Sequence, residues 1–160
     1  MMQTVTQTST NPQESAYRNY QGGFFKVLIS PEETQGSFAL VDMTLPRGVE
    51  PPVHIHTRED ETFYVLDGEM TFHVGEKAIK AGVGESVFSP RQVQHHFEIN
   101  TPTARFLTFI TPGQFLEYFL QFSFPAAEQV QVTPPQGPPP AEHIAFMTSQ
   151  LEEKYGVLFL

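Results

Sequence analysis

Short stretches in which apolar and polar residues alternate fill the chain from residue 23 to residue 110, separated by glycines, prolines and acidic turns. Successive side chains of a β-strand point to opposite faces, so these stretches predict half-buried strands. The predicted strands cover residues 24–29, 37–45, 53–56, 61–66, 69–74, 77–80, 85–88, 93–99 and 104–110. Asp67 and Gly68 tolerate positive φ, which indicates a β-hairpin between two of the strands. Many short strands without helical periodicity between them predict an all-β sandwich or barrel.

The pattern changes after residue 112, where apolar residues recur at helical spacing. An aromatic-rich stripe over residues 113–122 predicts a helix. Residues 126–140 include the stretch TPPQGPPP, which cannot form helix or sheet and predicts an extended connector. A second helix is expected over residues 141–155, ended by Gly156 and followed by a short apolar tail. The two helices either cover the mouth of the β-domain or simply pack against it or across a dimer.

These patterns divide the chain into four segments. Residues 1–16 are polar and predict a flexible N-terminal arm. Residues 17–125 form the β-domain with its following helix, residues 126–140 are the Pro-rich connector, and residues 141–160 are the C-terminal helix and tail. A chain of 160 residues is long enough for one domain that buries roughly 70% of its unfolded surface.

Charge and composition restrict the class of protein. The formal net charge is −9, which argues against a nucleic-acid or anionic-membrane surface because few cations would face the phosphates. The chain has no cysteine, so it offers neither disulfides nor thiolate metal ligands. The sequence shows neither a signal-peptide pattern nor an apolar run long enough to span a membrane. We therefore expect a cytoplasmic protein.

Candidate chemistry is concentrated at His54, His56 and Glu61. The two histidines are two residues apart, so on a strand both imidazoles point to the same face. The polar residues 57–60 can reverse the chain, and an antiparallel return strand would carry the Glu61 carboxylate back beside the imidazoles. Two nitrogens and one oxygen converging on a cavity are typical ligands of zinc, iron, nickel or manganese. The spacing predicts a metal site.

Two neighbouring carboxylates compete with Glu61 for this role. Glu61, Phe63 and Val65 share one face of their predicted strand, so Glu61 begins an apolar row that faces inward. Glu59 and Asp60 lie in the predicted turn, where carboxylates are usually solvated. We therefore select Glu61 as the ligand.

A fourth ligand is available at His95 or His96. On a strand over residues 93–99, His95 shares the apolar face with Phe97 and Ile99, whereas His96 lies on the opposite face. This alternation favours His95 as the inward imidazole, and a β-bulge would exchange the two. Of the other histidines, His73 is expected at the surface, and His143 has no partner pattern.

These residues follow the two motifs of the cupin superfamily, and the sequence resembles that family. The first motif has a Gly, five residues, His-x-His, three or four residues, a Glu, six residues and a Gly; the matching residues are Gly48, His54, His56, Glu61 and Gly68. The second has a Gly, five residues, a Pro and, five positions on, a His; the matching residues are Gly84, Pro90 and His95. Two positions depart from the pattern: Gln92 replaces the usual Gly after the Pro, and the closing Asn is displaced to Asn100.

The stretches TREDETFYVLDGEMTFHVG and ARFLTFITPG are also similar to the bacterial single-domain cupins related to quercetin 2,3-dioxygenase. The resemblance implies a double-stranded β-helix, or jelly-roll barrel, with short C-terminal helices. It implies one divalent transition metal ion per chain, Ni, Mn, Fe, Co, Zn or Cu, held by His54, His56, Glu61 and His95. It further implies a homodimer that cleaves a flavonol or similar enolisable aromatic with O₂, with Glu61 as the catalytic base.

Other functions stay open, because one fold supports many chemistries. The chain could be another metal-cupin enzyme, an isomerase or a lyase, for which O₂ is irrelevant. It could also be a non-catalytic cupin that binds a small ligand. An interior lined by Phe63, Val65 and Phe97 would suit a flat aromatic substrate.

Overall fold

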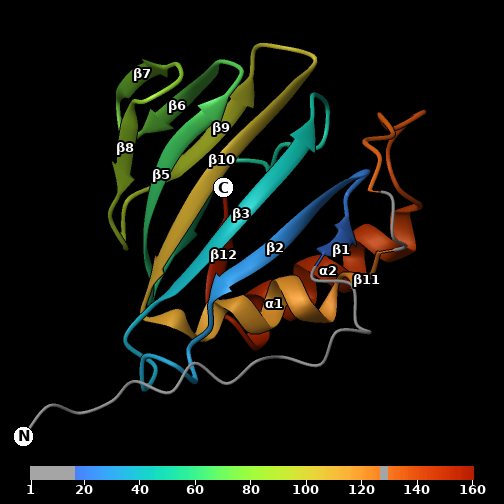
Figure 1. Ribbon diagram of the computed structural model, residues 1–160. Helices are drawn as coiled ribbons and strands as arrows, with labels where there is room; N and C mark the ends of the chain where they lie inside the picture. The colour runs from blue at the N-terminus through green and yellow to red at the C-terminus, as the bar shows by residue number, and fades with distance from the viewer. Residues whose placement is uncertain (1–16, 127–129) are drawn as a thin grey trace, which may run out of the picture.

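The structure is a computed structural model that describes residues 17–126 and 130–160, so the predicted arm over residues 1–16 lies outside the described residues. Two antiparallel β-sheets pack face to face (Figure 1). The strands of the seven-stranded sheet are, in spatial order, β11 (Phe124–Pro125), β1 (Tyr17–Tyr20), β2 (Gly23–Ile29), β3 (Ala39–Pro46), β10 (Thr103–Thr111), β5 (Asp60–Asp67) and β8 (Ser86–Ser89). Those of the five-stranded sheet are β12 (Val157–Phe159), β4 (His54–His56), β9 (His95–Ile99), β6 (Met70–Val74) and β7 (Lys77–Ala81).

The prediction of an all-β jelly roll is confirmed. All nine predicted strands are present, with ends displaced by at most two residues. From β3 to β10 the chain crosses repeatedly between the two sheets, and only β6 and β7 are consecutive strands of one sheet. This alternation is the double-stranded β-helix. Sequence patterns missed β1, β11 and β12, which are short strands added at sheet edges.

The hairpin predicted at Asp67 and Gly68 is wrong. β5 belongs to the seven-stranded sheet and β6 to the five-stranded sheet, so the connection between them crosses from one sheet to the other. Gly68 does have a φ of +83°, and a β-carbon there would lie 2.6 Å from Oγ1 of Thr101. The dipeptide therefore indicated the positive φ of Gly68 correctly, but Asp67 has no positive φ, and the direction of the next strand was not indicated. The hairpin is instead at Gly75, between β6 and β7.

Helices cover one end of the two sheets (Figure 1). A 3₁₀ turn, η1 (Gly113–Phe115), leads into α1 (Leu116–Gln121), and α2 (Ala141–Glu153) follows the connector. The aromatic stripe of the first helix is buried at Phe115, Tyr118 and Phe119. α2 buries Met147, while Phe146 stays 53% exposed. Within the described part of the chain, neither length nor apolarity of any helix suffices for a membrane crossing.

Aromatic side chains fill the space between the sheets. Phe63 of β5 packs on Phe72 of β6 with ring centroids 5.0 Å apart, and Phe97 of β9 packs on Phe106 of β10 at 5.7 Å. All four are buried, as is Val65. Contacts of this kind bury large apolar area and fix the distance between the sheets. The expectation that this part of the interior is open to a flat substrate is therefore wrong, because the aromatic rings occupy it themselves.

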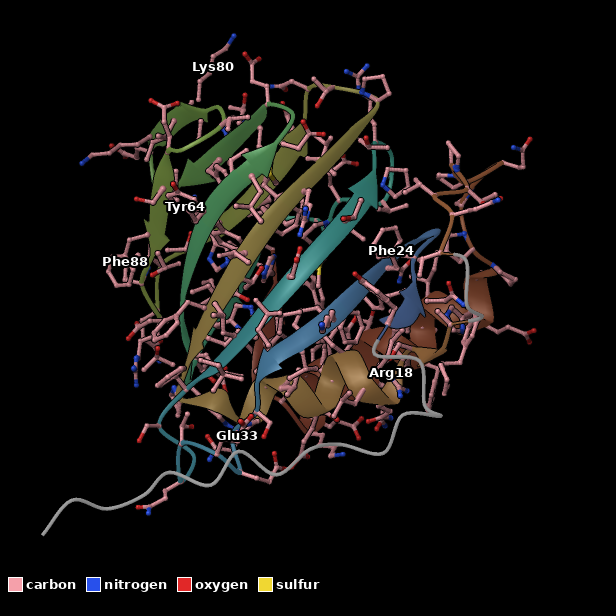
Figure 2. The ribbon with its side chains drawn as sticks, in the orientation of Figure 1. Arg18, Phe24, Glu33, Tyr64, Lys80 and Phe88 are labelled. Atoms are coloured by element: carbon pink, nitrogen blue, oxygen red, sulfur yellow. The ribbon has the colours of Figure 1, made fainter. Side chains whose placement is uncertain are left out.

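One edge of the seven-stranded sheet carries exposed aromatic side chains. Phe88 of β8 lies at the outer edge of the sheet, and Tyr64 belongs to the neighbouring strand β5 (Figure 2). Tyr64 is 42% exposed and Phe88 is 56% exposed. β8 has a strand neighbour on one side only, so its outer backbone groups are unpaired within the sheet.

Candidate metal centre

Three histidines come from neighbouring strands of the five-stranded sheet. His54 and His56 are the ends of the three-residue strand β4, and His54 lies directly opposite His95 of β9. The period of two places both β4 imidazoles on the inner face, where His56 is only 2% exposed. Strand geometry therefore brings the three imidazoles together without any loop residue.

Glu61 reaches the histidines from the opposite sheet. Its strand, β5, lies between β10 and β8, so the expected antiparallel return beside β4 is wrong. The chain crosses to the facing sheet between β4 and β5, and the inward row of β5 then points Glu61 at the imidazoles. Oε2 of Glu61 lies 3.4 Å from Nε2 of His56 and 3.2 Å from Nε2 of His95. The Glu61 carboxylate of one sheet thus contacts two histidines of the facing sheet.

The structure brings all four predicted ligands together. We call His54, His56, Glu61 and His95 the inner cluster; one ligand atom from each lies within 4.8 Å of the others, and all four side chains are buried. The parity argument for β9 holds, because His95 is buried with Phe97 and Ile99, whereas His96 lies on the outer face. No bulge exchanges the two histidines.

The register of β9 is set at Gln92, where the sequence departs from the family motif. Gln92 has a φ of +65°, in the left-handed region that favours glycine. Its backbone N–H donates to the carbonyl oxygen of His56 at 2.8 Å, and its Nε2 donates to that of Thr57 at 2.9 Å. These two hydrogen bonds hold the turn before β9 against the end of β4, so His95 is positioned although the usual glycine is absent.

Backbone carbonyls determine which ring nitrogens face the centre of the cluster. Nδ1 of His54 lies 2.8 Å from the carbonyl oxygen of Pro52, and Nδ1 of His95 lies 3.2 Å from that of Val93. A carbonyl oxygen can only accept a hydrogen bond, so each Nδ1 carries the proton. Each Nε2 therefore keeps a free lone pair, the tautomer that a metal ligand requires.

A buried carboxylate that the sequence analysis set aside orients the third histidine. Glu59 is 4% exposed, and its Oε2 lies 3.4 Å from Nδ1 of His56. The prediction of a solvated turn carboxylate is therefore wrong, because Glu59, although it precedes β5, lies two residues before Glu61 and its side chain is buried on the same side. Asp60 begins β5 and pairs with Arg91, Oδ2 to Nη2 at 2.6 Å, so it too is more than a solvated turn residue.

Burial and proximity act in opposite directions on the titratable groups of the cluster. Burial raises the pKa of the Glu61 carboxyl, but His56 and His95 beside it lower the pKa to about 2. Burial, reinforced by the neighbouring imidazoles, lowers the pKa of His54 to about 4. Burial also lowers the pKa of His56, but Glu61 and Glu59 outweigh it and raise this pKa above its ordinary value. At neutral pH the cluster therefore presents an ionised carboxylate and a neutral His54.

The donor atoms of the inner cluster fit a cation. Nε2 of His95 and Oε2 of Glu61 lie 3.2 Å apart, which is a hydrogen bond when Nε2 carries a proton, and a metal cation in place of that proton would also join the two atoms. Three imidazole nitrogens and one carboxylate oxygen are ligands that first-row transition metals accept. The inner cluster could therefore hold one such ion.

A cavity of about 260 Å³ lies beside the cluster. Its lining residues are Arg58, Glu59, Pro112, Gln114, Phe115, Glu117, Lys154 and Tyr155. The Phe115 ring stands edge-on to the His56 ring, with centroids 4.5 Å apart. Phe115 and Glu59 therefore separate this cavity from the imidazoles, and the helix that carries Phe115 covers the centre.

The apolar tail predicted after the last helix forms a strand against the histidines. In β12, Val157 pairs with His56 and Phe159 pairs with His54. β4 consequently lies between β12 and β9 and has neighbours on both sides. The spacing of four apolar residues does not indicate which strand they pair with. Sequence analysis therefore missed the pairing of this tail with β4.

Residues 41–110 match the model of a protein family described as the cupin domain. This stretch begins in β3, ends in β10 and contains the whole inner cluster. Quercetin 2,3-dioxygenase of Bacillus subtilis (strain 168) is 24% identical over 111 residues, which are 69% of this chain and 33% of that protein. The chain therefore spans about a third of the length of this curated relative.

Solved structures share the fold. A predicted oxalate decarboxylase from Thermotoga maritima is 25% identical, with a TM-score of 0.54, and the match covers 62% of this chain and 94% of that one. KdgF from Halomonas sp. is 18% identical with a TM-score of 0.53, and the match covers 60% of this chain and 86% of that one. The similarity to KdgF is one of fold alone.

Proposed function

Because the chain is a cupin that resembles quercetin 2,3-dioxygenase, we propose that its inner cluster binds one divalent transition metal ion and that the protein is a metal-dependent dioxygenase. The observation that carries this proposal is the arrangement of the imidazoles. The Nδ1 atoms of His54 and His95 face backbone carbonyls, and that of His56 faces Glu59. The Nε2 lone pairs are thereby left for a cation beside Glu61.

The ion would be nickel, manganese, iron, cobalt, zinc or copper, since all of these accept imidazole and carboxylate ligands. His54, His56, His95 and Glu61 would hold it. When bound, such an ion acidifies a substrate hydroxyl and provides open positions for further oxygen ligands. Four protein ligands leave those positions available if the ion is five- or six-coordinate, as catalytic rather than structural sites require.

Glu61 has a second role in this proposal. One carboxylate oxygen would hold the metal, and the other would take the proton of the substrate hydroxyl. A carboxylate whose pKa is about 2 is ionised at neutral pH but is a weak base. It therefore accepts a proton only from a hydroxyl group that has become acidic. An enolisable aromatic such as a flavonol carries a hydroxyl of this kind.

The substrate would approach from the cavity lined by Phe115 and Tyr155. Their rings offer flat apolar surface, and Arg58 and Gln114 offer hydrogen-bond donors at the same cavity. Because Phe115 stands between the cavity and His56, its side chain has to turn aside for the substrate to reach the inner cluster. Movement of the Phe115 side chain would thus open the path from the cavity to the inner cluster.

A second candidate function is a metal-dependent lyase acting on a smaller substrate without O₂. The cavity of about 260 Å³ lies slightly below the range of roughly 300–1,000 Å³ found for drug-sized ligands. Its lining includes Arg58, which would meet a small carboxylate, and Lys154, whose Nζ lies 3.9 Å from Oε2 of Glu117 in the same lining. The likeness to a predicted oxalate decarboxylase from Thermotoga maritima is consistent with this alternative.

Oxygen uptake distinguishes the two functions. The protein is loaded separately with nickel, cobalt, manganese and iron, and flavonol loss is followed together with O₂ consumption in an oxygen electrode. The dioxygenase function predicts equimolar loss of flavonol and O₂ with at least one metal, and no loss with His54→Ala or Glu61→Ala. Turnover of a small carboxylate without O₂ would favour the lyase. Absence of both reactions in fully loaded protein would overturn both enzymatic functions.

A further inference from the structure

Three metal-ligating side chains meet on the outer face of the five-stranded sheet, opposite the inner cluster. His73 of β6 lies directly across from His96 of β9, and Glu98 follows two residues along the same face of β9. One ligand atom from each lies within 4.8 Å of the others. We call His73, His96 and Glu98 the outer cluster. The function proposed above makes no use of it.

The two outer imidazoles are aligned. Their rings are stacked with centroids 4.4 Å apart and planes within 1° of parallel. Direct cross-strand pairing places the β-carbons of His73 and His96 side by side, so the parallel rings stand next to each other on the outer face. Two imidazoles in this arrangement can offer lone pairs to one ion.

One nitrogen of this cluster has no hydrogen-bond partner. Nε2 of His73 is buried and makes no hydrogen bond. It lies 3.7 Å from Oε1 of Glu98, beyond hydrogen-bond distance. A buried polar atom without a partner is unfavourable and is rare in folded proteins. An ion between His73 and Glu98 would give this nitrogen a partner.

We propose that the outer cluster binds a second divalent metal ion, of the kind that prefers imidazole: zinc, nickel or copper. Metal–nitrogen distances of about 2.0–2.1 Å require only that the two rings tilt toward a common point. Both histidines are partly exposed, so the rings have room to tilt. The Glu98 carboxylate is 60% exposed and supplies the anionic ligand. Three protein ligands leave at least one position for an outside ligand.

The outer site shares no ligand with the inner cluster. Consecutive residues of β9 point to opposite faces, so His95 binds on one side of the sheet and His96 on the other. His96 and Glu98 also line an open surface depression, together with Arg47 and Asn100, so this side of the outer site faces solvent. An outside ligand such as a small anion or a donor group of a second protein therefore has access to an ion held there.

Metal counting tests the proposal. The full chain is dialysed against micromolar free Zn²⁺ alone, and bound zinc is measured by elemental analysis. We expect two equivalents per chain for the wild type and one for His73→Gln and for His96→Gln. The matched control is His143→Gln, which removes an exposed histidine outside both clusters and should keep two equivalents.

A second readout separates the outer site from the inner one. Cu²⁺ titrated into the wild type should give two superimposed electron paramagnetic resonance signals, and His73→Gln should remove only one of them. His54→Ala should remove the other signal. The single signals of the two variants should together account for both signals of the wild type. Unchanged far-ultraviolet circular dichroism would show that the variants are folded. A single zinc equivalent in the wild type, or two equivalents in both outer-cluster variants, would overturn the proposal.

Discussion

Oε2 of Glu59 lies 3.4 Å from Nδ1 of His56, and both atoms are buried without a hydrogen bond to any other described residue. Of the described ion pairs, this is the one that the Glu59 carboxylate makes. It holds the His56 ring in the orientation that directs Nε2 at Glu61, and it raises the pKa of His56. Carboxylates placed behind metal-binding histidines commonly have this orienting role.

Replacing Glu59 should weaken metal binding without unfolding the protein. Glu59→Gln keeps the shape of the side chain but removes its charge, so the His56 ring loses its electrostatic support. We expect metal affinity at the inner cluster to fall by about 10–100-fold. Competition with a chelator measures this change. Glu152→Gln, at an exposed position of α2, is the control, and equal affinity in the two variants would show that Glu59 does not orient the ring.

Glu61→Gln should remove metal from the inner cluster and change the acid stability of the metal-free protein. The folded pKa of Glu61 is about 2, below the ordinary value of 4.5, so its ionised form stabilises the fold above pH 4.5. That stability, about 3 kcal/mol at most, is lost as the pH falls from 4.5 to 2. Urea unfolding of metal-free wild type should therefore weaken over this window more than that of Glu61→Gln. Parallel pH profiles would contradict this.

Gly156→Ala should detach β12 from the histidine strand. Gly156 has a φ of +69°, and a β-carbon there would lie 2.6 Å from Oγ1 of Thr57. Thr57 donates two hydrogen bonds to the Gly156 carbonyl, from its backbone N–H and from Oγ1. We expect a loss of at least about 1 kcal/mol in the free energy of unfolding, together with weaker metal retention.

The control for this substitution is Gly137→Ala. A β-carbon at Gly137 would meet no atom within 4 Å, and its φ lies outside the left-handed region. Stability and metal retention should stay at the wild-type level. Denaturant unfolding and chelator competition measure both variants, and equal behaviour of the two would show that the conformation of Gly156 does not support β4.

A homodimer should form through the edge strand β8. Phe88 is 56% exposed beside unpaired backbone groups, and a second copy of the same edge would cover both. Phe88→Ser should therefore halve the molar mass measured by light scattering after gel filtration. Phe146→Ser, which removes an aromatic ring of 53% exposure from α2, should leave the mass unchanged. A monomeric wild type, or a dimeric Phe88→Ser, would contradict the assignment.

Residue alternation accounts for what the sequence could predict. Glu61, Phe63 and Val65 are buried in β5, and His95, Phe97 and Ile99 are buried in β9, as period-two parity required. This parity is local and depends only on strand geometry, so it can be read without knowledge of the partner strands. The four residues of the inner cluster followed from it together with motif spacing.

Relationships between distant segments could not be predicted in the same way. Asp67 and Gly68 indicated a positive φ but not that the chain would cross to the other sheet. Glu59 does precede β5, as predicted, but the path of that turn buries its side chain behind His56, and the sequence gives no signal for that path. β12 has three apolar residues and no signal for its partner strand, because its pairing with β4 depends on the path of the chain through α2.

The pairing of β12 with β4 has a consequence for the order in which the protein matures. During synthesis, residues 157–159 leave the ribosome after the four residues of the inner cluster. Until then, one edge of β4 has no neighbouring strand. An uncovered strand edge attracts other chains. A stalled nascent chain would therefore possess all four residues of the inner cluster while still lacking the strand that pairs with two of them.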